Sequence, residues 1–222
     1  MKSKQLQNSI ILKDISFETR PGVFLFKNLN LSLGSQKSGL VGDNGTGKTT
    51  ILKLLIGELS PYSGTIKKRA KISYLPQDYQ VNLHLTVKQT LATEKEHEAL
   101  EALAHMELQY IDLDRLMESL SGGERMRVVL AKLLTQEADY LVLDEPTNNL
   151  DQNARQVVYN LIRDWKGGLL VVSHDRTLLN FMNEILELSD KGLKVYGGNY
   201  DFYAEQKSLE REAARRQLSD AE

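Results

Sequence analysis

The spacing of hydrophobic and polar residues predicts a chain in which strands and helices alternate. Two runs near the start, Ile10–Phe17 and Val23–Leu33, alternate apolar and polar residues, which is typical of half-buried antiparallel strands. Three shorter runs predict buried strands, two of them continuously apolar and therefore covered on both faces. These runs are Ser38–Val41, Tyr140–Leu143 and Leu169–Val172. We therefore expect an antiparallel β portion joined to a mostly parallel sheet.

Apolar residues at helical spacing predict helices between these strands. One helix is expected from about Thr50 to Glu58, and a largely helical stretch is expected from Val87 to Glu107 with Thr86 as its cap. Ser121 and Glu124 stand at capping-box spacing ahead of an amphipathic pattern. A further helix should therefore start at Ser121.

These elements predict three blocks and a tail. Residues 1–77 contain the β portion and the first part of the α/β core, residues 78–135 form a helical subdomain, and residues 136–204 complete the core. Residues 205–222 are rich in Arg, Glu and Ala and contain no Pro or Gly. Taken alone, this tail predicts a charged, solvated helix.

Composition limits the function classes. The chain has 222 residues, 41% of them hydrophobic, and a net charge of −2, which excludes a strongly basic nucleic-acid binder. It has no cysteines, so a disulfide framework and a cysteine metal site are excluded. No apolar run approaches the roughly 20 residues that span a bilayer, and the polar first residues do not resemble a signal peptide. We therefore expect a soluble, cytoplasmic protein without membrane insertion.

Residues 42–49 read Gly-Asp-Asn-Gly-Thr-Gly-Lys-Thr and lie between an expected strand and an expected helix. This is the spacing of a phosphate-binding loop, whose glycines let backbone N–H groups surround a phosphate chain. Lys48 would reach the terminal phosphates, and the Thr49 hydroxyl would hold Mg²⁺. A glycine-rich turn without a ligand is the alternative. The predicted nucleotide-binding residues here are Gly42, Asp43, Asn44, Gly45, Thr46, Gly47, Lys48, Thr49 and Thr50.

Polar residues also follow the other two expected core strands. Asp144 and Glu145 come directly after one strand, at the edge of a parallel sheet where ligands collect. Asp144 would bind Mg²⁺, and Glu145 would accept a proton from the attacking water. His174 follows the next strand and could donate a hydrogen bond to a γ-phosphate. The alternatives are a solvated acidic turn and a capping histidine.

The expected helix start at Ser121 carries two adjacent glycines, Gly122 and Gly123. A cap needs only the serine and the glutamate, whereas glycines in the first turn cost helix stability, about 1 kcal/mol each. Their bare N–H groups at a positive helix end favour an anion. The sequence therefore predicts a second half-site for phosphate, against the simpler interpretation of a helix cap.

In order and spacing, six motifs resemble those of the ATP-binding-cassette (ABC) ATPases, from about residue 10 to residue 190. They are Gly42–Thr49 as the Walker A loop, Gln77 as the Q-loop, Leu120–Glu124 as the signature, Leu141–Glu145 as the Walker B strand, Asn148–Asp151 as the D-loop and His174 as the switch histidine. The resemblance implies an α/β P-loop NTPase fold with an inserted helical signature subdomain. It also implies ATP and Mg²⁺ as cofactors.

The same resemblance implies a Mg²⁺-dependent ATPase with shared sites, in which the signature of one cassette covers nucleotide on another. The catalytic residues would be Glu145, His174 and Gln77, and the metal would meet Thr49, Gln77 and Asp144. Ser121, Gly122, Gly123 and Asp151 would complete the nucleotide site across the two cassettes. Isolated, one cassette should have weak activity. The resemblance implies an adenine-stacking tyrosine where this chain has Thr19; Phe17 or Phe24 could replace it, and core residues are the equal alternative for both.

Two segments are similar to the ABC-F subfamily, whose members carry two cassettes and act on ribosomes. These segments are Glu145–Asp151 and Tyr196–Tyr203. This resemblance implies the first cassette of a longer protein, with residues 205–222 opening the linker between cassettes. The partners would be a second cassette, from the same longer chain or from another copy, together with the ribosome and tRNA. A transporter's nucleotide-binding subunit and a cassette without effective turnover are the alternatives.

Overall fold

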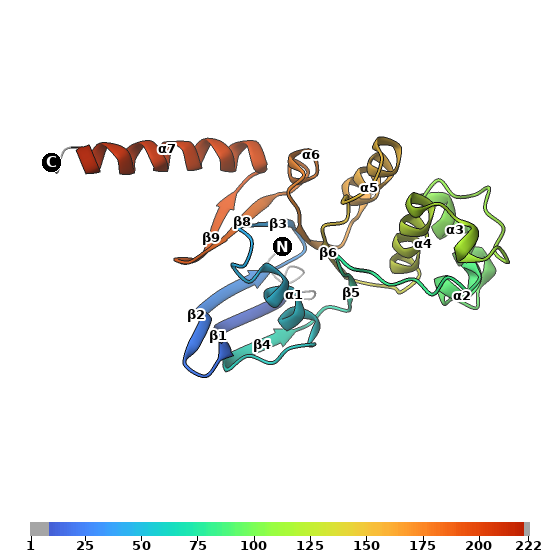
Figure 1. Cartoon of the computed structure of the whole chain (residues 1–222), viewed down its shortest axis with the longest axis horizontal. Coiled ribbons are helices and arrows are strands. Elements are labelled where there is room, and N and C mark those ends of the chain that lie inside the picture. The colour runs from blue at the N-terminus through green and yellow to red at the C-terminus, as the bar shows by residue number, and fades with distance from the viewer. Residues whose placement is uncertain (1–8, 220–222) are drawn as a thin grey trace, which may run out of the picture.

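The computed structural model describes residues 9–219, in which strands and helices alternate along the chain (Figure 1). The strands are β1 (Ile10–Arg20), β2 (Val23–Leu33), β3 (Lys37–Val41), β4 (Ser63–Lys68), β5 (Ile72–Leu75), β6 (Tyr140–Asp144), β7 (Gly168–Val172), β8 (Glu184–Ser189) and β9 (Gly192–Gly197). The helices are α1 (Lys48–Ile56), α2 (Val87–Leu91), α3 (Glu96–His105), α4 (Gly122–Leu134), α5 (Gln152–Asp164), α6 (Arg176–Leu179) and α7 (Tyr200–Ser219), with a 3₁₀ turn at Met117–Ser119. Residues 1–8 of the predicted first block and 220–222 of the predicted tail lie outside the described residues.

The described strands form two sheets. One is antiparallel, with the order β2-β1-β4, and the other has the order β5-β6-β7-β3-β8-β9. In the larger sheet all neighbours run parallel except β8 and β9, which form an antiparallel hairpin. This confirms the predicted α/β class, a mostly parallel core with an antiparallel β portion.

The central parallel strands are covered on both faces, which explains their continuous apolar sequences. In β6, Leu141 and Leu143 pack in one core with α4 and α5. Tyr140 and Val142, which point to the other face, pack in a second core with α1 and the antiparallel sheet. Since neither face of β6 meets solvent, its polar groups can reach a ligand only where the strand ends.

The helices α2, α3 and α4 gather beside the β5 edge of the larger sheet (Figure 1). The predicted cap Thr86 is confirmed, because it forms a capping box with Gln89 at the start of α2. The stretch Val87–Glu107 is largely helical, as predicted, but it forms two helices, because the chain leaves the first at Ala92, with φ of 53°, and the second starts at Glu96. A straight helix would turn the buried residues of α3 by roughly 120° away from those of α2. The break lets both groups face the core.

Two helix starts were predicted closely. Helix α4 begins after Ser121, whose hydroxyl accepts from the Glu124 N–H (3.3 Å), while the Glu124 carboxylate accepts from the Ser121 N–H (2.7 Å). Helix α1 begins two residues before the expected Thr50 and ends two residues before the expected Glu58. It ends there because Gly57 leaves the helix with φ of 91°. Within residues 9–219, no helix combines the length and the apolar character needed to cross a membrane.

Candidate active site

The order of the larger sheet places the predicted site residues side by side. Strands β5, β6, β7 and β3 are consecutive neighbours, and all four run parallel. Gln77 follows β5, the two carboxylates lie at the end of β6, His174 follows β7 and the glycine loop follows β3. Because parallel strands end at the same edge, one surface receives all four groups.

The loop at residues 42–49 depends on glycine at specific places. Gly42, Gly45 and Gly47 have φ of 155°, 84° and 105°, in or beyond the left-handed region that side chains rarely adopt. A Cβ on Gly42 would lie 2.3 Å from the Leu188 carbonyl oxygen, and one on Gly47 would lie 2.8 Å from Leu25. The loop therefore approaches β8 and β2 more closely than any other residue type allows.

Lys48 is the first residue of α1, and its side chain turns back over the loop. Its ammonium donates to the carbonyl oxygens of Gly42 (2.7 Å) and Asp43 (3.0 Å). The Thr46 hydroxyl donates to the same Asp43 carbonyl (2.9 Å). The loop thus holds one positive charge, together with the free N–H groups of a helix start, over a concave backbone.

Two buried carboxylates face this positive charge. Asp144 is 2% exposed and Glu145 is 9% exposed. The Thr49 hydroxyl lies 3.5 Å from Asp144 Oδ2, at the outer limit of a hydrogen bond. Burial raises the pKa of the Asp144 carboxyl, against the Thr49 hydrogen bond and the Lys48 charge, which lower it. Burial raises the pKa of the Glu145 carboxyl as well.

Glu145 occupies a constrained position. Its φ is 50°, unusual for a residue with a Cβ, and its N–H donates to the Val172 carbonyl (2.8 Å) at the end of β7. The carboxylate meets His174 twice, with Oε2 accepting from the backbone N–H (3.4 Å) and Oε1 lying 3.5 Å from Nε2. The histidine side chain is 66% exposed, so it is free to meet a ligand from the solvent side. The strained backbone at Glu145 thus holds a buried carboxylate against an exposed histidine.

These groups surround a cavity of about 540 Å³. The predicted site residues that line it are Asn44, Gly45, Gly47, Lys48, Thr49, Thr50, Gln77, Asp144, Glu145 and His174. Gly42, Asp43 and Thr46 stand behind it and shape the loop. The structure therefore places ten of the residues predicted from the sequence around one cavity.

Four lining residues had no predicted role as ligands: Thr19, Leu25, Asn148 and Val172. Thr19 does lie at the cavity, as the resemblance placed it, but its hydroxyl donates to the Val23 carbonyl (3.2 Å). Phe17 and Phe24 do not line the cavity; Phe17 packs on Phe26 and Phe24 on Tyr62, with ring centroids 6.1 and 5.2 Å apart. Nothing in the spacing of β2 singles out Leu25, which was therefore missed.

The second predicted half-site lies outside this cavity. Ser121, Gly122 and Gly123 begin α4 and do not line the cavity, and Asp151 caps α5 by accepting from the Ala154 N–H (2.8 Å). Neither glycine has a left-handed φ. A Cβ on Gly122 would meet no heavy atom of the described residues within 4 Å, and one on Gly123 would meet only Ala154 at 3.7 Å. The packing of this chain therefore does not require either glycine.

The donor set fits a magnesium-bound nucleotide. Asp144 and Thr49 offer two oxygen ligands of the kind that hard cations prefer. Between residues 9 and 219 there is no cluster of three His, Cys, Asp or Glu side chains that could hold a metal alone. A cation here would need oxygens from a bound phosphate chain, and the loop and Lys48 offer the donors for that chain.

The chain matches the ABC transporter family over residues 26–148. It is 38% identical to the ATP-binding protein YdiF of Bacillus subtilis over 93% of this chain and 34% of that protein. It is 34% identical to ABC transporter F family member 5 of Arabidopsis thaliana, over 90% of this chain and 31% of that protein. The chain therefore spans about a third of the length of these relatives.

Among solved structures, an ABC transporter in an inward-facing conformation superposes with a TM-score of 0.74. Its sequence is 26% identical, and the match covers 86% of this chain and 83% of that one. This agrees with the predicted fold, a P-loop core of ABC type with an inserted helical portion.

The raised pKa of Glu145 predicts a pH-dependent gain in stability for Glu145→Gln. The pKa of Glu145 is higher in the folded protein than in the unfolded chain, so the protein becomes less stable as the pH rises through the folded pKa. Below the unfolded pKa this loss of stability is absent. The amide avoids the loss and still offers an oxygen to the His174 N–H. Urea unfolding should show the gain at about pH 7.5 and its disappearance towards about pH 4.

Glu205→Gln is the matched control for that measurement, because Glu205 is exposed on α7. It should change the unfolding midpoint little at any pH. A Glu145→Gln protein that is no more stable than the parent at neutral pH would contradict the assigned burial cost.

Proposed function

The chain belongs to the ATP-binding-cassette (ABC) family, and from this we propose that it binds ATP with Mg²⁺ and hydrolyses the terminal phosphate. One observation carries the proposal. The Lys48 ammonium, the Thr49–Asp144 pair and the Glu145–His174 pair face the same cavity from three neighbouring strands, β6, β7 and β3. A triphosphate with its metal has the charge and the size for that cavity.

The chemistry follows from what each side chain can do. Lys48 exchanges its two carbonyl partners for phosphate oxygens, which are stronger acceptors for an ammonium. Thr49 and Asp144 hold the cation, and Gln77 reaches the same cavity from the β5 side. When bound, Mg²⁺ supplies positive charge for the phosphate oxygens.

Glu145 is the proposed general base. Burial raises its pKa, which brings its proton affinity closer to what a base needs near neutral pH. Its Oε1 lies 3.5 Å from His174 Nε2, so a water that donates to this carboxylate from the cavity would lie beside the γ-phosphate that His174 is proposed to hold.

Glu145→Gln should reduce ATP turnover by roughly 10² or more while ATP binding is retained, since a general base is lost and no phosphate ligand is removed. Phosphate release gives turnover, and equilibrium dialysis with labelled ATP gives binding. Lys48→Met is the contrasting variant, because it should weaken binding itself. Hydrolysis by Glu145→Gln at a near-parental rate would remove Glu145 from this role.

The signature residues are proposed to act on a second cassette. Ser121, Gly122 and Gly123 form an exposed helix start that does not reach this chain's own cavity, and the chain's packing explains neither glycine. A phosphate chain on another cassette would explain both, because close approach of the backbone to an anion needs bare N–H groups. This assigns residues 78–135 as the signature subdomain, between core parts 1–77 and 136–204.

Gly122→Ala separates this role from folding. A Cβ there meets nothing in the described chain, so the free energy of unfolding should stay constant or rise by up to about 1 kcal/mol. ATP turnover should fall roughly tenfold or more, because the methyl group would stand between two cassettes. Gly197→Ala, which also meets open space, should leave both quantities unchanged.

Turnover is measured over a range of protein concentrations in that experiment. A shared site predicts that the rate per molecule rises with concentration as copies pair. Full activity of Gly122→Ala, or a strong rate that is independent of concentration, would contradict the shared site.

We propose further that the chain is an ABC-F cassette from a cytoplasmic, ribosome-associated factor. Support comes from the sequences of the segments Glu145–Asp151 and Tyr196–Tyr203 and from the F-family relative at 34% identity. The relatives are about three times longer, which is compatible with a second cassette elsewhere in the protein. The alternative, a transporter's nucleotide-binding subunit, is supported by the likeness to a solved ABC transporter structure.

Sedimentation with purified ribosomes tests this narrower proposal. Glu145→Gln protein should pellet with ribosomes when ATP and Mg²⁺ are present, and should stay in solution without ATP, because ATP would be bound and not turned over. Lys48→Met protein should not pellet under either condition. If Glu145→Gln binds ATP and still remains in solution, the ribosome assignment is wrong while the ATPase assignment stands.

A further inference from the structure

The segment Tyr196–Tyr203 has a structural task that the nucleotide chemistry does not explain: it ends β9 and begins α7. Gly198 turns the chain with φ of 108°, and its N–H donates to the Asn183 carbonyl (2.8 Å). The Asn199 side chain then accepts from the Phe202 N–H (3.2 Å), as a helix cap does. Gly198 and Asn199 thus fix where α7 begins.

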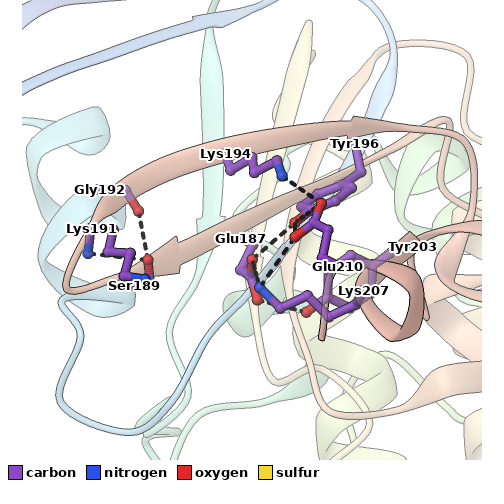
Figure 2. Close-up of polar contacts among 9 residues, drawn as sticks. All are labelled: Glu187, Ser189, Lys191, Gly192, Lys194, Tyr196, Tyr203, Lys207 and Glu210. Carbon is purple, nitrogen blue, oxygen red and sulfur yellow. Dashed lines mark hydrogen bonds and ion pairs between the residues drawn. The ribbon is translucent and has the colours of Figure 1, made fainter. Parts of the chain in front are cut away.

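Glu187 on β8 is the hub of a polar network that holds α7 in place (Figure 2). Its carboxylate accepts from the Tyr203 hydroxyl (2.9 Å), the Lys207 ammonium (2.6 Å) and, more weakly, the Tyr196 hydroxyl (3.3 Å). The side chains of Glu187 and Lys207 are only 14% and 27% exposed. Charge-assisted bonds in such a setting are stronger and shorter than surface ones.

A second ring of contacts surrounds this hub. Glu210, one turn further along α7, accepts from Lys194 (2.5 Å) and from the Tyr196 hydroxyl (3.1 Å). The Tyr196 and Tyr203 rings meet edge to face with centroids 5.0 Å apart. Lys194 and Glu210 are about half exposed, so their pair contributes little and the hub contributes most.

The hub lies directly beside the phosphate loop. In the parallel pairing of β3 with β8, Glu187 is opposite Val41, the residue that precedes the loop. The next residue on β8, Leu188, has its carbonyl oxygen against Gly42, so close that no side chain fits between them. Gly42 in turn accepts a hydrogen bond from Lys48. Contacts therefore run without a gap from Lys48 to α7.

Residues 208–216 of α7 are exposed, and the helix points away from the body of the molecule (Figure 1). A helix attached only at its first turns acts as a lever, because a small rotation at the attachment becomes a large displacement at its end. A close-packed attachment transmits such rotations without absorbing them. The Glu187 hub is the least exposed ion pair of this attachment, and the Asp201 N–H adds a bond to Asn180 (3.0 Å) at the first turn.

We propose that the Glu187 hub clamps α7 to the strand that borders the phosphate loop and couples the direction of α7 to the state of that loop. The two states are Lys48 bonded to the loop carbonyls and Lys48 bonded to phosphate. The clamp is independent of any ligand, whereas the coupling to nucleotide rests on the proposed function. Tyr203, Lys207 and Glu187 are positioning residues in this scheme.

Hydrogen–deuterium exchange on the protein without nucleotide tests the clamp first. Tyr203→Phe removes one hydroxyl from the hub, and it should speed exchange of the amides at residues 204–210 about tenfold, with a smaller increase at residues 42–47. Glu187→Gln keeps an acceptor for Tyr203 and loses the ion pair, so it should act in the same direction. Tyr62→Phe is the matched control, because Tyr62 is 65% exposed, and it should change neither segment.

Exchange with saturating Mg²⁺-ATP tests the coupling. ATP should slow exchange in residues 204–210 of the parent protein, and this protection should be lost in Tyr203→Phe although dialysis shows that ATP is bound. Unchanged exchange of α7 in both variants would overturn the clamp, and a change in α7 without any change at residues 42–47 would overturn the coupling. Failure of the parent to bind ATP would instead overturn the proposed function, and the experiment without nucleotide would still decide the clamp.

Discussion

The burial of β6 and β7 on both faces is the constraint from which the site follows. Strands covered by α1 and the antiparallel sheet on one side and by α4 and α5 on the other have no face left for polar groups. Each strand can offer chemistry only at its carboxyl end. Since β5, β6, β7 and β3 are parallel neighbours, their ends form one row, and Gln77, Glu145, His174 and the glycine loop stand in that row. The core therefore makes the site.

Two buried carboxylates and one ammonium set the electrostatics of this row. Asp144 and Glu145 are buried carboxylates whose pKa values burial raises, and Lys48 donates to two loop carbonyl oxygens. Buried charges of this kind are stable only when paired or coordinated. Under the proposed function, a cation at Asp144 and a phosphate chain at Lys48 would pair both kinds of charge at once. A site built this way should bind the two ligands together better than either alone.

Sequence reasoning succeeded where chemistry and periodicity coincide. The loop at 42–49, the end of β6 and the capping box at Ser121 are local patterns, so they were found without tertiary information. It failed where contacts from elsewhere decide. The break at Ala92 arises because α2 and α3 must both face the core, and no residue between them is a strong helix breaker. Leu25 lines the cavity because Gly47 approaches β2, a contact that the sequence of β2 does not announce.

A sequence motif that indicates a family can also have a structural role. The segment Tyr196–Tyr203 served above only to indicate a family. In the structure, the hydroxyls of Tyr196 and Tyr203 bond to Glu187, a carboxylate that lies outside this segment but beside it in space. A helical element is thus attached on each side of this row of strands. The helical portion is joined through Gln77 at β5, and α7 is held at β8. Strands packed this tightly cannot absorb a shift between them, so under the proposed function a second cassette closing on one flank and α7 on the other would respond to the same nucleotide. Such responses are reciprocal by thermodynamic necessity: whatever restrains α7 from outside must also change the affinity of the loop for ATP.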